Sequence, residues 1–107
     1  MTCESIDDVI AVRKIFLTNG PSENKQIFVY IGRPYEDVNL GEFWCPYQII
    51  GIGTEKVRKI AGIDAIQAIQ GTLLVIGAEL EGLNAACDYN LSWDGGEPGD
   101  VGFARPV

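Results

Sequence analysis

The feature that most constrains the fold is a regular spacing of apolar residues between Asp64 and Leu83. Large aliphatic side chains recur there at alternating steps of three and four residues, namely Ile66, Ile69, Leu73, Ile76, Leu80 and Leu83. This spacing places all of them on one stripe of an α-helix. At 1.5 Å per residue such a helix is roughly 30 Å long. We expect its apolar stripe to cover a sheet.

The predicted helix carries signals for its start and its end. Asp64 can accept hydrogen bonds from the first turn, and Gln67, three residues later, completes a capping-box pattern. Gly82 and Asn84 supply a place where the helix can end. The sequence therefore predicts a helix over residues 64–83.

A shorter helix is expected just before it. Thr54 can cap a turn over residues 55–60, and Gly62 can end that turn in a left-handed conformation. We read this region as helix, glycine break, helix, and one bent helix is the alternative.

The helix face opposite the apolar stripe is unusually free of charge. No Asp, Glu, Lys or Arg occurs in residues 65–78, and a glycine inside a helix costs about 1 kcal/mol relative to alanine. Small side chains let another element approach closely, so this face could be covered by the rest of the chain or by a second copy of the protein. The alternative is a weakly polar face that is open to water. The uncharged run is too short for a membrane span. The possible interaction surface consists of Gln67, Gly71, Leu74, Val75, Ala78 and Gly82.

Alternation of side chains predicts strands on either side of the helix. Residues 10–18 and 25–31 alternate, and Asn19-Gly20-Pro21-Ser22 between them is a strong turn signal, so they should form an antiparallel hairpin. Residues 43–50 form a third strand, which Pro46 should place at an edge or at a bulge because proline cannot donate to a ladder. Residues 34–41 are a loop, and residues 89–93 are a short last strand.

These elements predict a single α+β domain spanning residues 1–107. The sheet is antiparallel with three to four strands, packed by one long helix in the order β-β-β-α-β. Residues 1–8 and 104–107 should be loosely ordered.

Composition excludes several classes of function. The net charge of −7, with scattered Lys and Arg, argues against nucleic-acid binding, although an acidic surface could face a basic protein partner. The chain has no histidine, and Cys3, Cys45 and Cys87 are widely spaced, so no metal site or cofactor is expected. The start of the chain has no secretory pattern, which predicts a cytoplasmic protein with reduced thiols.

The candidate reactive residues each have a simpler interpretation. Cys45 has no histidine to activate it, and a buried core cysteine is the stronger reading; Cys87, beside two alanines, also reads as packing. Carboxylates in the glycine-rich loop could bind calcium, but they recur at every third residue, which is not an EF-hand pattern. These carboxylates are Asp94, Glu97 and Asp100.

Two further groups could bind a partner or an anion. Arg33, Tyr35 and Trp44 form a weak polar-aromatic cluster, which would recognise a partner if exposed together. The alternative is that the aromatic rings pack over a sheet edge while Arg33 pairs with an acid such as Glu36. Gly51-Ile52-Gly53 could cradle an anion before a helix, but a plain β-to-α turn explains it.

Four motifs resemble a family of small uncharacterised bacterial proteins that carry a domain of unknown function. The motifs are Ile31-Gly32-Arg33-Pro34, Trp44-Cys45-Pro46-Tyr47-Gln48-Ile49, Gly62-Ile63-Asp64-Ala65-Ile66-Gln67-Ala68 and Gly95-Gly96-Glu97-Pro98-Gly99-Asp100. The resemblance covers most of the chain after residue 10. It implies a bacterial cytoplasmic protein and assigns no functional residues.

The sequence favours a non-catalytic binding or interaction module over an enzyme. The uncharged helix face suggests a homodimer, and the acidic charge also fits an immunity-type inhibitor of a basic toxin. A small-ligand binder with its site between sheet and helix is a further alternative. An enzyme would need a pocket lined by Glu42, Arg33 or the carboxylates of residues 94–100, because Asp and Glu can serve as acid and base once their pKa values are tuned.

Overall fold

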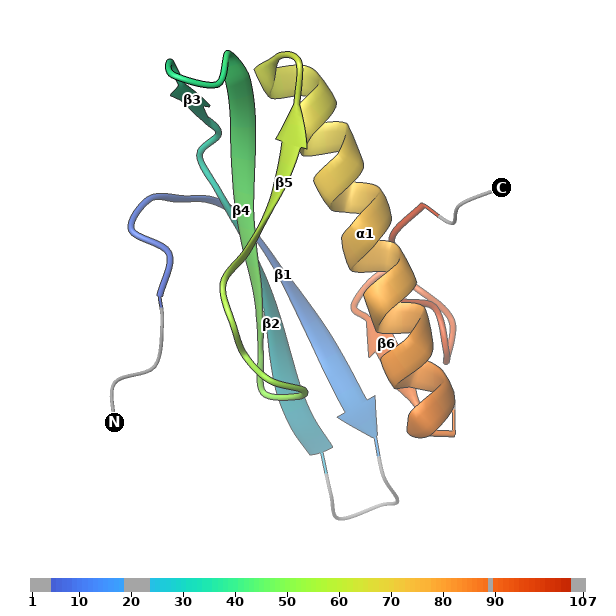
Figure 1. The fold of residues 1–107 in the computed structure, drawn as a ribbon. Coiled ribbons are helices and arrows are strands. Elements are labelled where there is room, and N and C mark those ends of the chain that lie inside the picture. Colours follow the sequence, from blue (N-terminus) through green and yellow to red (C-terminus); the bar gives the residue numbers. More distant parts are fainter. Residues whose placement is uncertain (1–4, 19–23, 89, 105–107) are drawn as a thin grey trace.

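The computed structural model describes residues 5–18, 24–88 and 90–104 and has an α+β fold (Figure 1). One long helix lies across one face of an antiparallel sheet, as the sequence predicts. In chain order the elements are β1 (Val9–Thr18), β2 (Asn24–Gly32), β3 (Tyr35–Asp37), β4 (Glu42–Ile50), β5 (Arg58–Gly62), α1 (Ala65–Ala86) and β6 (Leu91–Trp93).

The sheet is larger than the three to four strands predicted. It has six strands in the order β3-β4-β2-β1-β6, and β5 also pairs with β4. Strands β3 and β5 account for the difference. They are only three and five residues long, so neither shows enough alternation to be recognised from sequence.

The predicted hairpin is confirmed by the pairing of β1 with β2. The two strands run antiparallel over their full lengths, with Ile15 opposite Ile27, and a bulge interrupts the register between Val9 and Ala11. The predicted turn at Asn19-Gly20-Pro21-Ser22 lies outside the described residues, as do residues 1–4 and 105–107 of the ends that we expect to be loosely ordered.

Of the two positions predicted for the Pro46 strand, an edge or a bulge, the edge is wrong, because β4 is an interior strand. Pro46 pairs with Lys59 of β5 on one side. On the other side, the partner of β4 changes from β2 at Tyr47 to β3 at Trp44. Pro46 lies in the gap between these two pairings, where its missing N–H interrupts neither of them.

The predicted short helix over residues 55–60 is also wrong, because Arg58–Gly62 forms strand β5. The edge of β4 opposite to β2 and β3 provides backbone hydrogen-bond partners that a single helical turn cannot match. Gly62 has no left-handed backbone. It is small because α1 passes over it, and a Cβ there would lie 2.9 Å from the Cα of Ala68. Likewise, the predicted loop over residues 34–41 contains β3 before its turn.

Helix α1 begins where the sequence predicts but ends later. Asp64 is the N-cap, and its carboxylate accepts from the backbone N–H of Gln67 at 2.8 Å. The Gln67 side chain reaches back and accepts from the N–H of Ile63 at 2.6 Å. The helix passes Gly82 and Asn84 and ends at Ala86. Asn84 does not end the helix because its side chain is fully buried against the segment that follows.

The buried face of α1 is rotated from the predicted stripe. Ala68, Thr72, Ile76 and Leu80 are completely buried, whereas Ile69, Leu73 and Leu83 are only partly buried against the core. Ile66, the first residue of the predicted stripe, is 67% exposed. The core residues that the sheet contributes are Ile15, Ile27, Val29, Ile31, Cys45, Tyr47, Ile49 and Leu91.

Candidate functional site

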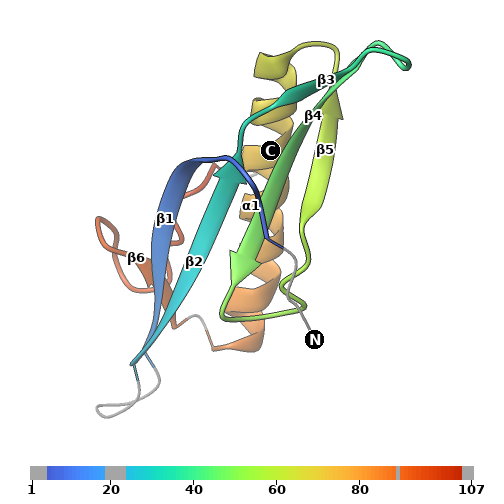
Figure 2. The ribbon, with the colours of Figure 1, turned by 90° about the vertical axis from the view of Figure 1, so that its left-hand side faces the viewer.

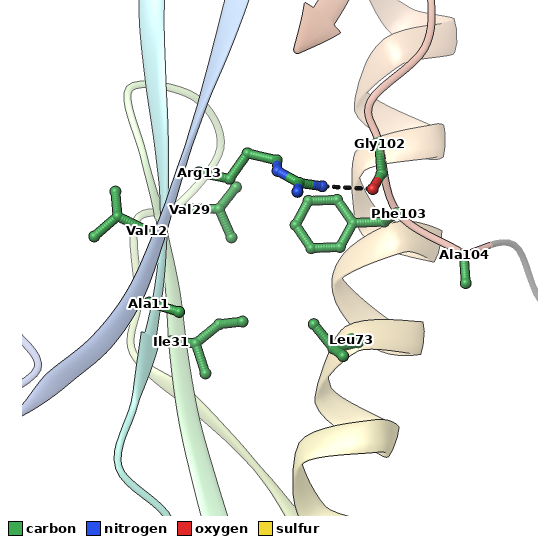
Figure 3. Close-up of a pocket in the computed structure, with 9 residues that line it drawn as sticks. All are labelled: Ala11, Val12, Arg13, Val29, Ile31, Leu73, Gly102, Phe103 and Ala104. Carbon is green, nitrogen blue, oxygen red and sulfur yellow. Dashed lines mark hydrogen bonds between the residues drawn. The ribbon is translucent and has the colours of Figure 1, made fainter. Parts of the chain in front are cut away.

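A groove lies between the β1–β2 hairpin and helix α1, on the sheet face that the helix covers (Figure 3). Its volume is about 340 Å³. Ala11 and Ile31 point into it from the strands, and Leu73 faces them from the helix. The remaining lining residues are Val12, Arg13, Val29, Gly102, Phe103 and Ala104.

The third wall of the groove is the segment after β6, which rests on α1 at Gly77. A Cβ at residue 77 would lie 2.7 Å from the carbonyl oxygen of Ala104 and 3.2 Å from the Cβ of Phe103. The glycine therefore lets the segment approach the helix backbone and holds Phe103 at the side of the groove. The energetic cost of this close approach is the lower helix propensity of glycine at that position.

Among the residues that the structure describes, Arg13 is the only charged one that lines the groove. Its Nη1 donates to the carbonyl oxygen of Gly102 at 2.5 Å. The guanidinium also lies 4.5 Å from the ring centroid of Trp93 and 5.0 Å from that of Phe103. Two aromatic rings and one carbonyl thus fix the position of a permanent positive charge at one end of an apolar groove.

The glycine-rich acidic loop serves to enclose Trp93. Gly95, Gly96 and Gly102 all lie against its indole, each so close that a Cβ would overlap the ring. Asp100 accepts from the N–H of Gly102 at 2.8 Å, and this bond supports the left-handed backbone of that glycine (φ 79°). The loop therefore holds in place the Trp93 ring against which the Arg13 guanidinium lies.

The candidate metal ligands do not come together. Asp94, Glu97 and Asp100 are exposed in this loop. Within residues 5–18, 24–88 and 90–104, no three His, Cys, Asp or Glu side chains form a group that could hold a metal ion.

The predicted cluster of Arg33, Tyr35 and Trp44 is partly assembled. Tyr35 and Trp44 are cross-strand partners between β3 and β4, and Lys59 lies 4.5 Å from the Trp44 ring centroid. Arg33 pairs with Asp8 at 2.6 Å, not with Glu36. Arg33 and Tyr35 also line a second hollow of about 360 Å³ beside residues 5–8, which Trp44 does not line.

The predicted interaction surface on α1 is left largely uncovered by the described chain. Leu74 and Val75 are 43% and 37% exposed, and apart from the adjacent helix backbone no atom of the described residues lies within 4 Å of the position a Cβ would take at Gly82. Gly71 is the exception, because Ile60 of β5 lies 3.1 Å from its Cβ position. The remaining members, Gln67 and Ala78, are exposed.

The buried polar groups beneath the helix lie outside the groove. The Tyr47 hydroxyl donates to Glu79 at 2.9 Å, and burial together with that carboxylate raises the pKa of Tyr47 to about 12. Cys45 is completely buried, as predicted. Burial raises the pKa of its thiol, against a smaller lowering from a hydrogen bond with Thr72. A buried thiol with a raised pKa is a poor nucleophile.

Arg13 is not among the site residues predicted from the sequence, although a signal for it was present. Arg13 alternates with Ala11, Ile15 and Leu17 on one face of β1. A charged residue on the apolar face of a strand is the feature that could have identified the groove.

Comparison with known protein families matches residues 11–105 to the family described as "Domain of unknown function (DUF6968)". The chain belongs to this family. The DUF6968 match spans nearly the whole described fold, including every lining residue of the groove, and its description assigns no activity. Searches of curated proteins and of solved structures found no match.

Among the described residues, no helix is both long and apolar enough to span a bilayer. The 22-residue helix α1 carries glycines, Thr72 and Asn84 within its length.

Proposed function

We propose that this DUF6968 protein is a non-catalytic binding module whose site is the groove between the β1–β2 hairpin and α1. The expected ligand combines an apolar group with a single carboxylate. The observation that carries this proposal is the placement of one fixed guanidinium, Arg13, in a groove otherwise lined by apolar side chains and backbone.

The size and chemistry of the groove support this choice of ligand. Its volume of about 340 Å³ is at the lower end of the range for small-ligand sites, which are mostly apolar with a few polar groups that fix orientation. Arginine binds carboxylates through paired hydrogen bonds, and a water-poor setting strengthens them. No acidic residue in the described part of the chain lines the groove to compete for Arg13.

The same lining supports binding over catalysis. General acid–base chemistry requires a group that exchanges a proton near neutral pH. Arginine remains protonated in proteins, and within residues 5–18, 24–88 and 90–104 no other ionisable side chain lines the groove. Tyr47 and Cys45, whose pKa values are both raised, lie in the core.

Matched acid and alcohol pairs would test the proposal. We expect hexanoate and phenylacetate to stabilise the protein in thermal melts, and hexanol and phenylethanol to do so much less. The Arg13→Met variant keeps an unbranched apolar side chain but removes the charge, and should reduce the preference for acids over alcohols at least tenfold. Arg33→Met is the control, because Arg33 is exposed and does not line the groove. Equal binding of acids by Arg13→Met and the parent protein would refute the proposal.

A second candidate function is homodimerisation through the uncharged face of α1. The exposure of Leu74 and Val75 beside small residues favours it, because exposed apolar surface often marks an interaction site. Light scattering coupled to size-exclusion chromatography would test it, with Leu74→Glu as the disrupting variant. A monomer at high concentration would rule it out. A basic protein partner, including a toxin, is supported by the net charge of −7 alone.

A further inference from the structure

One edge of strand β1 is open along the first part of the strand (Figure 2). Strand β2 pairs with β1 along its whole length. Strand β6 pairs with the opposite edge, but only at Ile15, Phe16 and Leu17. From Val9 to Lys14, no residue that the structure describes pairs with that second edge.

The open edge presents unpaired backbone groups. The N–H of Thr18 donates to Asn90 at 3.1 Å, towards the β6 side. Backbone groups alternate along a strand, so those of Phe16, Lys14 and Val12 point the same way. Phe16 meets β6, whereas Val12 and Lys14 have no partner there among the described residues. Unpaired strand edges are templates for the addition of another strand.

The edge and the groove form one continuous surface. Ala11, Val12 and Arg13 belong to the open edge and also line the groove. An added strand would send alternate side chains to the two faces of the sheet. Every second side chain would therefore enter the apolar groove, opposite Leu73. Val12, at 54% exposure, leaves this edge accessible.

Strand β6 limits where an added strand can end. Because β6 occupies the edge from Ile15 onwards, an added strand must stop at Lys14. Arg13 lines the groove at this point, and Lys14 follows it on the other face of the strand. A chain that ends here with a carboxylate meets two positive charges, whereas an amino terminus would be repelled by both.

We propose that the groove binds the C-terminal segment of an extended peptide, which adds to the sheet as a strand parallel to β1. This inference rests on the proposed function and names its ligand. The terminal carboxylate binds Arg13, an apolar side chain near the terminus fills the groove, and backbone hydrogen bonds form with Val12 and Lys14. Addition of a strand at a sheet edge beside an apolar groove is an established mode of peptide recognition.

The probe is a six-residue peptide of alternating threonine and valine that ends in valine with a free carboxylate. Its C-terminal amide and the single residue N-acetylvaline are the comparison ligands. We expect the free acid to bind at least tenfold tighter than the amide. We also expect it to bind at least tenfold tighter than N-acetylvaline, which cannot pair along the edge.

Variants at Val12 isolate the backbone contribution. Val12→Pro removes an N–H that points away from β2, which proline tolerates at an open edge, and should weaken peptide binding about tenfold relative to Val12→Ala, whereas the two variants should bind N-acetylvaline equally. Val12→Ala is the control, because it trims the side chain but keeps the N–H. Should Val12→Pro fail to fold, hydrogen exchange in the parent protein gives the same test. Peptide addition should then slow exchange of the Val12 and Lys14 amides.

The outcomes separate this inference from the proposed function. Binding of small carboxylates at Arg13 without tighter peptide binding would overturn the inference and leave the proposed function intact. Failure of both ligand classes would overturn both. A dimer in the parent protein that Val12→Pro splits would assign the edge to a second copy and overturn the peptide proposal.

Discussion

Replacement of Asn84 by alanine should destabilise the fold strongly and release the wall of the groove. The Asn84 side chain is fully buried on α1. Its Nδ2 donates to the carbonyl oxygen of Gly99 at 2.9 Å, and its Oδ1 accepts from the N–H of Leu91 at 3.0 Å. One side chain thus ties the helix both to β6 and to the loop that encloses Trp93.

The magnitude follows from the two groups that alanine would leave without partners. An unpaired buried donor or acceptor costs about 1–3 kcal/mol. Leu91 is completely buried and Gly99 only partly, so we expect Asn84→Ala to lower the free energy of unfolding by about 2–4 kcal/mol. This is a large share of the roughly 5–15 kcal/mol typical of a small domain.

Urea denaturation followed by circular dichroism would measure the loss, and Trp93 fluorescence would report the loop. Asn90→Ala is the matched control, because Asn90 is exposed and bonds through its backbone N–H and carbonyl. We expect that variant to stay within about 0.5 kcal/mol of the parent. A similarly small change for Asn84→Ala would show that the two hydrogen bonds do not hold the C-terminal segment on the helix.

Three further predictions concern the helix face and the core. Gly82→Ala should raise stability by about 0.5–1 kcal/mol in thermal melts, because no other described segment lies near the Cβ position of residue 82. A loss of stability would indicate that a partner packs there. Stability should fall as pH rises from about 10 towards 12, because the folded state raises the pKa of Tyr47 to about 12 and so keeps its proton longer than the unfolded chain. Tyr47→Phe should flatten that slope, and an unchanged slope would contradict the assignment. In the native protein Cys45 should react with a thiol reagent far more slowly than Cys87, because its thiol is buried with a raised pKa; equal rates in a mass-resolved assay would count against this packing.

The elements that sequence reasoning predicted are those with a pattern set by local burial. The alternation in β1, β2 and β4 and the three-to-four spacing in α1 repeat over many residues, so each pattern identifies its element without knowledge of its neighbours. Strand β5 could not be found this way. Arg58–Gly62 becomes a strand because β4 offers an open edge, a condition that depends on the tertiary fold.

The groove was less accessible to prediction than the elements that form it. The prediction of one buried apolar stripe on α1 assumes that the sheet covers the helix along its whole length. Instead Ile66 is exposed and Leu73 lines a groove. The separation of the two layers depends on the twist of the sheet and on the segment held at Gly77, and neither is encoded in any short pattern of residues.

The attachment of the groove walls has a mechanical consequence. One wall belongs to the β1–β2 ladder, and the other is carried by α1, with Phe103 resting on the helix at Gly77. The described hydrogen bonds that join the two walls lie at the Arg13 end, through Gly102 and the β1–β6 pairing. A tilt of the helix can therefore spread the Val9 end without breaking a rung of the hairpin. The groove is therefore fixed at its charged end and can widen at the other. We expect it to select strictly for the terminal carboxylate of a bound peptide and to tolerate different side chains farther from that terminus.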